Sequence, residues 1–250
     1  MGHYKLIALD MDGTLLNEDK AISEGNRKAI QAAKAAGVTV VLSTGRNLHN
    51  IMAYIDELAL SSPVVTVNGG EVWETPEKLQ KRTTLDHRLV ERMREIALRQ
   101  DSWFWAYSVE GVFNKNNWIE KPISELEWLK FGYHIENPEA LASIRAELES
   151  WDVLEITNSH PFNLELNPKG VSKASGLQDV CELLGIEMSQ VVAVGDSLND
   201  MSMIRQAGLG VAMGNAQEEV KREAGFITSS NEEDGVARVI WEHLVSPEGA

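Results

Sequence analysis

The sequence predicts an α/β fold in which helices cover both faces of a parallel sheet. In the first and last thirds of the chain, strand-like and helix-like segments alternate, which is typical of such sheets. The strand-like segments are continuous apolar runs, and this indicates strands that are buried on both faces. The middle third lacks the alternation and is rich in aromatic residues, so we expect it to form an inserted α+β unit.

The first third supplies the opening strands and helices of the predicted sheet. Ser23 is the expected N-cap of the first helix, and Gly37 is its expected stop. β-Branched residues directly after this glycine favour a strand. In chain order we expect a strand over 4–9, a helix over 23–36, a strand over 38–43, a helix over 48–60 and a strand over 64–67.

The last third repeats the alternation. A helix over 172–184 is followed by Gly185, which fits a helix end. The further predicted elements are a strand over 191–194, a helix over 200–206, a strand over 209–212 and a helix over 236–244. Both ends of the chain therefore form one core, and an insert can interrupt it if its two connections lie close in space.

The middle third predicts a small sheet with two helices. Strand-like runs cover 103–108, 128–135, 153–157 and 162–166. One helix begins at Asp86, and another has Asn137 as its cap and Pro138 as its first residue. The predicted organisation is a core over 1–85 and 167–250 with an insert over 86–166.

The aromatic residues of the insert have two interpretations. They can fill a core between sheet and helices, or some can face a substrate and exclude water. Trp103 and Trp105 share one face of their strand, whereas Phe104 points to the other face.

The composition excludes several classes of partner. A formal net charge of −15 opposes binding to a nucleic-acid backbone or an anionic membrane surface. A local pocket of cations and backbone N–H groups can still bind a phosphorylated small molecule. Cys181 is the only cysteine, so an intrachain disulfide is impossible and a reducing compartment is expected. Without a signal pattern or a membrane-length apolar run, we expect a cytoplasmic protein with no membrane partner.

Two acidic residues, Asp10 and Asp12, directly follow the first apolar strand. Charged carboxylates at the end of a buried strand are costly, so two of them there point to a function. One can act as a nucleophile while the other transfers protons, and both can help to bind a hard cation such as Mg²⁺.

Three further motifs fall where open α/β sheets bind ligands, at strand ends and at a helix start. A hydroxyl and a glycine N–H can donate to a phosphoryl oxygen, and a lysine at a helix N-terminus favours a bound dianion. The last motif adds further acidic side chains and an amide donor at a strand end. The residues concerned are Thr44 with Gly45, Lys173, and Asp196 with Asn199 and Asp200.

Each motif also has an explanation that needs no ligand. The run 43–45 fits a strand-to-helix turn, a lone lysine is usually solvated, and Arg46 can pair with a carboxylate. Asp196 or Asp200 can cap the following helix, and 68–70 fits a hairpin turn as well as a substrate contact. One phosphate site explains all four motifs and their order along the chain. Four independent ligand-free explanations in that same order would be a much rarer event.

These motifs resemble those of the haloacid dehalogenase superfamily, and closely those of its Cof-type sugar-phosphate phosphatase branch. The loops at 68–70 and 212–216 are also similar to recurring loops of that core. The resemblance implies a Rossmann-like parallel-sheet core with an inserted α+β cap of the C2 type. It rests on Asp10-x-Asp12-Gly13-Thr14, Ser43-Thr44-Gly45-Arg46, Lys173 and Gly195-Asp196-x-x-Asn199-Asp200.

The resemblance also implies a role for each residue. Asp10 would attack phosphorus and form an aspartyl-phosphate, while Asp12 would protonate the leaving alcohol and later deprotonate the attacking water. Mg²⁺ would be held by the Asp10 carboxylate, the Asp12 backbone carbonyl and Asp196. The transferring group would be held by the N–H groups of Met11 and Gly45 and by Thr44, Lys173 and Asn199. Gly13, Thr14, Arg46 and Asp200 would support the site.

The implied function is Mg²⁺-dependent hydrolysis of small phosphorylated metabolites, foremost sugar phosphates. Alternatives within enzymes are a phosphomutase of the same superfamily and a flavin-pathway or pyridoxal phosphate phosphatase. A dehalogenase is disfavoured, since a halide leaving group needs no proton from Asp12. Outside enzymes, a phosphosugar-binding protein is an alternative that the intact Asp10 and Asp12 oppose. A receiver-like signalling module needs neither the insert nor this acidic loop.

Overall fold

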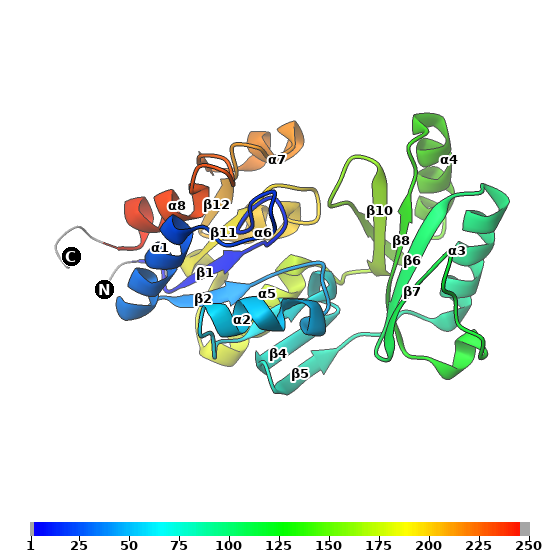
Figure 1. The fold of residues 1–250 in the computed structure, drawn as a ribbon, viewed down its shortest axis with the longest axis horizontal. Coiled ribbons are helices and arrows are strands. Elements are labelled where there is room, and N and C mark those ends of the chain that lie inside the picture. Colours follow the sequence, from blue (N-terminus) through cyan, green and yellow to red (C-terminus); the bar gives the residue numbers. More distant parts are fainter. Residues whose placement is uncertain (1–2, 246–250) are drawn as a thin grey trace. The chain divides into compact units, whose positions relative to one another are not determined.

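The structure, a computed structural model, describes residues 3–245 and divides the chain into two compact units (Figure 1). The first unit consists of Met1–Lys81 and Lys173–Ala250, and the second is the continuous segment Arg82–Ser172. The predicted insert boundaries at 86 and 166 fall inside the second unit.

The first unit is built on a five-stranded parallel sheet with the order β13-β12-β11-β1-β2 (Figure 1). β1 (Leu6–Leu9) pairs with β11 (Val191–Gly195) on one side and with β2 (Thr39–Leu42) on the other. β12 (Leu209–Ala212) and the short β13 (Phe226–Ile227) complete the sheet. The predicted parallel sheet, formed from both ends of the chain, is confirmed.

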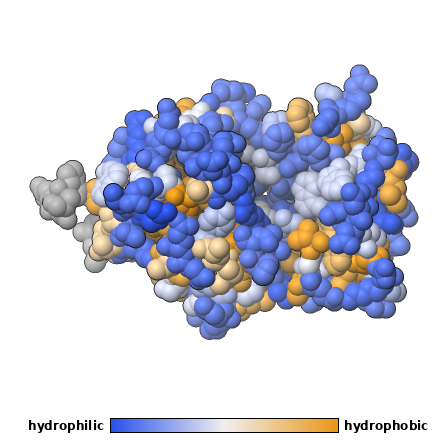
Figure 2. Space-filling view, viewed as in Figure 1, coloured by the Kyte–Doolittle hydropathy of each residue, from blue (hydrophilic) through white to orange (hydrophobic). Residues whose placement is uncertain are grey.

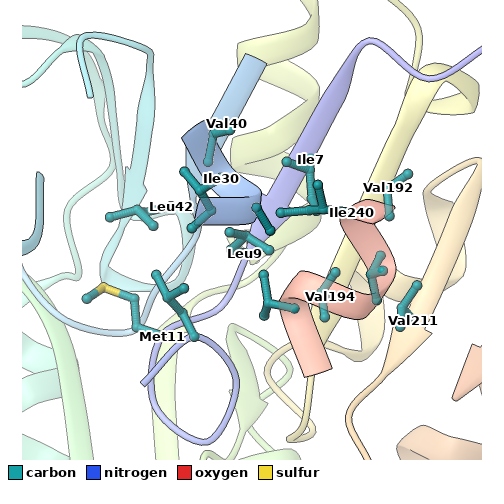
Figure 3. Packing of buried hydrophobic residues seen from close by; sticks show 14 of the residues in the cluster. Ile7, Leu9, Met11, Ile30, Val40, Leu42, Val192, Val194, Val211 and Ile240 are labelled. Atoms are coloured by element: carbon teal, nitrogen blue, oxygen red, sulfur yellow. The ribbon is translucent and has the colours of Figure 1, made fainter. Parts of the chain in front are cut away.

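Apolar side chains on both faces of this sheet are buried beneath helices. Ile7 and Leu9 belong to one cluster with residues of α1 and α8 (Figure 3). Leu6 and Ala8 point to the opposite face, where they join residues of α5. The helices of this unit are α1 (Glu24–Ala35), α2 (Met52–Glu57), α5 (Lys173–Leu184), α6 (Met201–Gln206), α7 (Glu218–Glu223) and α8 (Gly235–His243).

Several parts of the first unit differ from the sequence prediction, and α7 and β13 were not predicted. The helix expected over 48–60 is a 3₁₀ turn, η1 (Leu48–Ile51), followed by the short α2, which ends before Ala59 takes a left-handed φ of 48°. A hairpin that was not predicted follows β3. β3 (Val64–Thr66), β4 (Glu71–Thr75) and β5 (Lys78–Arg82) form a separate three-stranded sheet in this order.

The second unit contains a five-stranded antiparallel sheet with the order β7-β6-β8-β10-β9 and two long helices. The predicted cap Asn137 accepts from the N–H groups of Glu139 and Ala140. The helix expected to begin at Asp86 has this residue as its N-cap, and Asp86 accepts a hydrogen bond from the Arg88 N–H. The elements are α3 (His87–Arg99), β6 (Trp103–Ser108), β7 (Gly111–Asn114), β8 (Trp128–His134), α4 (Pro138–Glu149), β9 (Leu154–Thr157) and β10 (Asn163–Pro168). Short 3₁₀ turns in the two units are η2 (Val67–Gly69), η3 (Ile123–Glu125) and η4 (Met188–Gln190).

Aromatic residues fill the core of the second unit. Phe104 is buried and stacks on Phe131, with 5.6 Å between the ring centroids. Trp103 is 38% exposed, and Trp105 packs where a Cβ on Gly132 of the neighbouring strand would stand. The predicted alternation of Phe104 against the two tryptophans is therefore confirmed.

Hydrophilic residues cover most of the face that Figure 2 displays, with hydrophobic residues in scattered patches between them. Across residues 3–245, no helix combines the length and the apolar character that a membrane crossing requires.

Candidate active site

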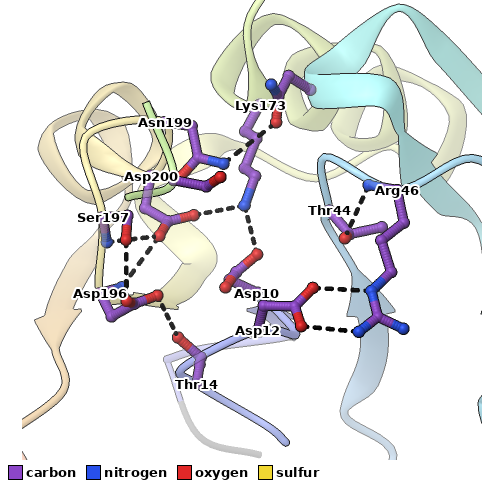
Figure 4. A network of polar contacts seen from close by, with 12 residues as sticks. Asp10, Asp12, Thr14, Thr44, Arg46, Lys173, Asp196, Ser197, Asn199 and Asp200 are labelled. Carbon is purple, nitrogen blue, oxygen red and sulfur yellow. Dashed lines mark hydrogen bonds and ion pairs between the residues drawn. The ribbon is translucent and has the colours of Figure 1, made fainter. Parts of the chain in front are cut away.

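The predicted site residues of the first unit gather around the carboxyl ends of β1, β2 and β11 (Figure 4). Asp10 to Thr14 follow β1, Thr44 to Arg46 follow β2, and Asp196 to Asp200 follow β11. Lys173, the first residue of α5, enters the same group from the other end of the chain. The parallel sheet brings these loops to one edge, as expected.

Lys173 connects two of the acidic residues. Its Nζ donates to Asp10 Oδ1 at 2.5 Å and to Asp200 Oδ1 at 2.6 Å. The Lys173 side chain is 0% exposed, so the interpretation of this residue as a solvated lysine is wrong. A buried ammonium needs such partners, because removing one charge from water without compensation is costly.

The buried charges shift the pKa values of the whole group. Burial raises the pKa of Asp10 well above its ordinary value, the Asp200 charge raises it further, and Lys173 opposes both effects. Burial lowers the pKa of Lys173, but Asp10 and Asp200 outweigh it, and the net shift is upward. Burial and the Asp200 charge also raise the pKa of Asp196 to about 7. Negative charge thus exceeds positive charge in this group.

This acidic cluster suits a hard divalent cation. Asp10, Asp196 and Asp200 each offer an oxygen within 4.8 Å of the others. Mg²⁺ prefers such oxygen ligands. A bound cation would also offset the negative charge that contributes to the raised pKa values of Asp10 and Asp196. Asp200 is already engaged, because its Oδ2 accepts from the N–H groups of Asp196 and Ser197 and its Oδ1 from Lys173. Asp10 accepts from Lys173, and Asp196 accepts from Thr14 and Ser197, which is fewer donors than Asp200 has, so Asp10 and Asp196 remain the predicted ligands.

Asp12 lies outside this cluster and has basic partners of its own. Arg46 donates to both oxygens of the Asp12 carboxylate, each at 2.7 Å, and Lys20 donates to one of them at 3.2 Å. Burial raises the pKa of Asp12, but the Arg46 and Lys20 interactions outweigh it and lower this pKa. The Asp12 backbone carbonyl remains a predicted metal ligand.

Hydrogen bonds join the loop after β1 to the loops after β11 and β12. Thr14 Oγ1 donates to Asp196 Oδ1 at 3.3 Å, and Asn215 Nδ2 donates to the Gly13 carbonyl at 2.8 Å. Gly13 has a φ of 80°, and a Cβ there would stand 2.6 Å from Asp196 Oδ2. Glycine is required at this position by both conformation and space.

The predicted phosphate-binding residues lie in the same region of the first unit. Met11, Thr44 and Asn199 are buried. The Thr44 hydroxyl accepts from the Arg46 N–H at 3.2 Å, which shapes the turn that contains Gly45. Contacts of these residues with a phosphoryl group remain predictions.

Sequence reasoning missed three residues that contact the site. Ser197 Oγ donates to Asp196 Oδ2 at 2.8 Å, and its place between Asp196 and Asn199 is a signal that could have been used. Asn215 belongs to the loop 212–216, whose resemblance to a recurring core loop is such a signal, whereas Lys20 has none. The contacts of both residues with the Asp10–Thr14 loop depend on the folded chain.

Comparisons with known proteins agree with this architecture. The family model described as haloacid dehalogenase-like hydrolase matches residues 7–141 and 119–240. Among curated proteins, 5-amino-6-(5-phospho-D-ribitylamino)uracil phosphatase YcsE of Bacillus subtilis is 47% identical over 236 residues, which is 94% of each chain. A protein of the same species with the same enzyme name, YitU, is 33% identical and covers 96% of this chain and 97% of its own.

Solved structures also resemble the fold. A haloacid dehalogenase-like hydrolase from B. subtilis superimposes with a TM-score of 0.87 at 26% identity, and the match covers 96% of this chain and 99% of the other. The likeness spans both the parallel-sheet unit and the insert.

Proposed function

The chain belongs to the haloacid dehalogenase-like hydrolases and is a phosphatase of that family, and we propose that it hydrolyses small phosphorylated metabolites with the help of Mg²⁺. The observation that carries this proposal is the buried Lys173, which holds Asp10 beside the acidic pair Asp196 and Asp200. A buried cation next to a nucleophilic carboxylate suits the transfer of a phosphoryl group, provided that a divalent cation offsets the surplus negative charge of the acidic pair.

In the proposed first step, a carboxylate oxygen of Asp10 attacks phosphorus while the bond from phosphorus to the leaving alcohol breaks. Lys173 holds Asp10 Oδ1 in place, so the carboxylate needs little reorientation. Asp12 gives its proton to the leaving oxygen. The product of this step is a phosphoryl group bound to Asp10.

In the second step, Asp12 takes a proton from a water, and the oxygen of that water attacks phosphorus and releases Asp10. Arg46 occupies both Asp12 oxygens in the structure, so this role requires the pair to open when substrate binds. Asp10, Asp196 and the Asp12 backbone carbonyl would hold Mg²⁺, which when bound neutralises charge on the phosphoryl oxygens.

The remaining site residues would bind the phosphoryl group. The N–H groups of Met11 and Gly45 are donors, as are the Thr44 hydroxyl and the Asn199 amide. Thr44 and Asn199 are buried, so their hydrogen bonds to a substrate would be little weakened by water.

The second unit is the part that we propose selects the substrate. Its sheet is apolar on the face that packs against α3 and α4. Lys130 and Glu165 alternate with the core residues of their strands and therefore lie on the opposite face of the sheet. They are buried, and Lys130 Nζ donates to Glu165 Oε2 at 3.0 Å and lies 4.7 Å from the Tyr107 ring centroid. Polar groups of both charges beside an aromatic ring suit a substrate with several hydroxyl groups and a polar ring.

The substrate to test first is 5-amino-6-(5-phospho-D-ribitylamino)uracil. YcsE and YitU, which are among the relatives that span nearly this entire chain, are named for it. Its phosphate is on a ribityl chain, so it also fits the sugar-phosphate class. We further propose a cytoplasmic location, which the single buried Cys181 supports.

The test is release of inorganic phosphate from this compound and from a panel of sugar phosphates. We expect release with Mg²⁺, none after EDTA, and recovery when Mg²⁺ is restored. Transfer of the phosphoryl group to a second sugar hydroxyl, without free phosphate, would instead indicate a phosphomutase. No turnover of any phosphate ester would contradict the proposal.

A further inference from the structure

We propose that Asn68 is a positioning residue of the phosphoryl site, where it fixes the amide of Asn199 and supports the turn that carries Thr44. This inference rests on the proposed function, because it takes the region around Asp10 as the place where the phosphoryl group binds. All of the contacts that carry it lie within the first unit.

The backbone around Asn68 is strained. Val67, Asn68 and Gly69 have consecutive φ values of 55°, 56° and 92°, all in the left-handed region. Glycine and asparagine tolerate this region, whereas a β-branched valine rarely enters it because its Cβ crowds the backbone. Such strain persists only where the surrounding structure enforces it, and it is frequent at functional sites.

Neighbouring segments hold this strained backbone in place. The Val67 N–H donates to the Arg46 carbonyl and the Asn68 N–H to the Thr44 carbonyl, both at 2.9 Å. On the opposite side, a Cβ added to Gly176 of α5 would stand 3.2 Å from Gly69 Cα. The segment therefore lies between the predicted phosphate-binding turn and the helix that begins with Lys173.

The Asn68 side chain reaches the other predicted phosphate loop. Asn199 Nδ2 donates to Asn68 Oδ1 at 3.3 Å, and the two residues are only 5% and 2% exposed. Asn199 directly precedes Asp200, the partner of Lys173 (Figure 4). Asn68 thus links the loop after β2 with the loop after β11.

The Asn199 side-chain amide can form further hydrogen bonds besides its contact with Asn68. Its Oδ1 is buried and has no hydrogen-bond partner within the part of the chain that the structure describes. Its Nδ2 carries a second hydrogen. Since a buried polar atom without a partner is costly, these atoms suit a bound ligand or its water. Asn68 holds the plane of the amide in which they lie.

A simple hairpin turn does not account for these contacts. A turn needs a residue that tolerates positive φ, which glycine or an exposed asparagine provides. Here the side chain is buried and bonded to a residue 131 positions away. The two interpretations of 68–70 are therefore compatible: the loop joins β3 to β4 and also positions Asn199.

The experiment compares Asn68→Gly with the wild type. Glycine retains the left-handed backbone and removes only the amide, so the fold should persist, as the melting temperature would verify. We expect kcat/KM to fall about fivefold to tenfold, as for the loss of one buried hydrogen bond. Ala59→Gly is the matched control, because Ala59 is an exposed non-glycine residue with a φ of 48° in the same unit; it should leave kcat/KM unchanged.

A double-mutant cycle with Asn199→Ala tests whether Asn68 acts through Asn199. We expect Asn68→Gly to add less than a twofold further loss in the Asn199→Ala background. Independent multiplication of the two losses, or wild-type kcat/KM for Asn68→Gly, would overturn the inference while the proposed function stands.

Binding of inorganic phosphate by calorimetry, with Mg²⁺ present, provides a readout that does not depend on turnover. Asn68→Gly should bind phosphate several-fold more weakly than the wild type and the Ala59→Gly control. Equal affinity, or no binding by the wild type, would overturn the inference. A wild type that binds phosphate but hydrolyses no ester would instead count against the proposed function.

Discussion

Asp12 shows how one residue can have partners that oppose its proposed role. A general acid must carry a proton, but Arg46 and Lys20 lower the pKa of Asp12. The bidentate Arg46 pair also holds both oxygens of the carboxylate. Proton donation matters most for a substrate with a poor leaving group, because a basic alkoxide leaves only with difficulty unless it is protonated. The dependence of the rate on the leaving group therefore tests whether Asp12 donates a proton.

Asp12→Ala should lower kcat by about 10²-fold to 10⁴-fold for an alkyl phosphate, because the alkoxide leaves without a proton. The loss should be much smaller for p-nitrophenyl phosphate, whose phenolate is stable. Steady-state kinetics on both substrates give the comparison. Asp19→Ala, which removes an exposed carboxylate from the same loop, is the control. Equal losses for the two leaving groups would argue against an acid role.

At the level of residues, the sequence was informative where several motifs coincide. Asp10, Lys173 and Asp196 were singled out because each follows a strand or opens a helix, and the structure brings them together. The loop 212–216 has a recognisable pattern, but the contact between its Asn215 and Gly13 spans 202 positions and is not specified by that pattern. Such contacts are determined by tertiary packing and could not be predicted.

At the level of elements, local chemistry predicted helix starts better than short strands. Ser23 and Asn137 each cap a helix as expected, because an N-cap is a local interaction, and Asp86 caps the helix that was expected to begin with it. The hairpin of β4 and β5 was missed, since its strands are polar and partly exposed and lack a continuous apolar run. The two-residue β13 is too short to leave a periodic signal.

At Gly176 in helix α5, close packing favours glycine whereas helix propensity favours alanine. A Cβ on Gly176 would stand 2.6 Å from Val65 Cγ1, so α5 can approach β3 closely only with glycine there. We expect Gly176→Ala to lower the free energy of unfolding by about 1–3 kcal/mol, although alanine is the better helix former. Urea unfolding measures the change.

Glu182→Ala is the control for this substitution, because Glu182 is exposed on the same helix. Its effect should stay within about 0.5 kcal/mol. If Gly176→Ala were as stable as the wild type or more so, the close packing of α5 would be refuted.

At the level of the whole molecule, the chain forms two units with separate hydrophobic cores. The sequence predicted a core that is interrupted by an insert, because strand-like and helix-like segments alternate in both the first and the last third of the chain. The positions of the connections were harder to predict: β5 runs to Arg82, and β10 continues to Pro168, beyond the apolar run that ended the prediction.

The separate core predicts that a fragment of residues 82–172 folds alone. We expect a single cooperative urea transition, because the aromatic cluster and both helices lie within the fragment. Phe131→Ala should weaken it by about 3–5 kcal/mol, since this ring is fully buried. A fragment without a cooperative transition would show that the second unit depends on the first.

The central claim is that Asp10 accepts the phosphoryl group, and the substitution Asp10→Asn tests it most directly. The change is nearly isosteric, so circular dichroism and melting temperature should match those of the wild type. With Mg²⁺ and the best substrate of the panel, we predict that phosphate release falls by about four orders of magnitude or more. Release within tenfold of the wild-type rate would contradict the account.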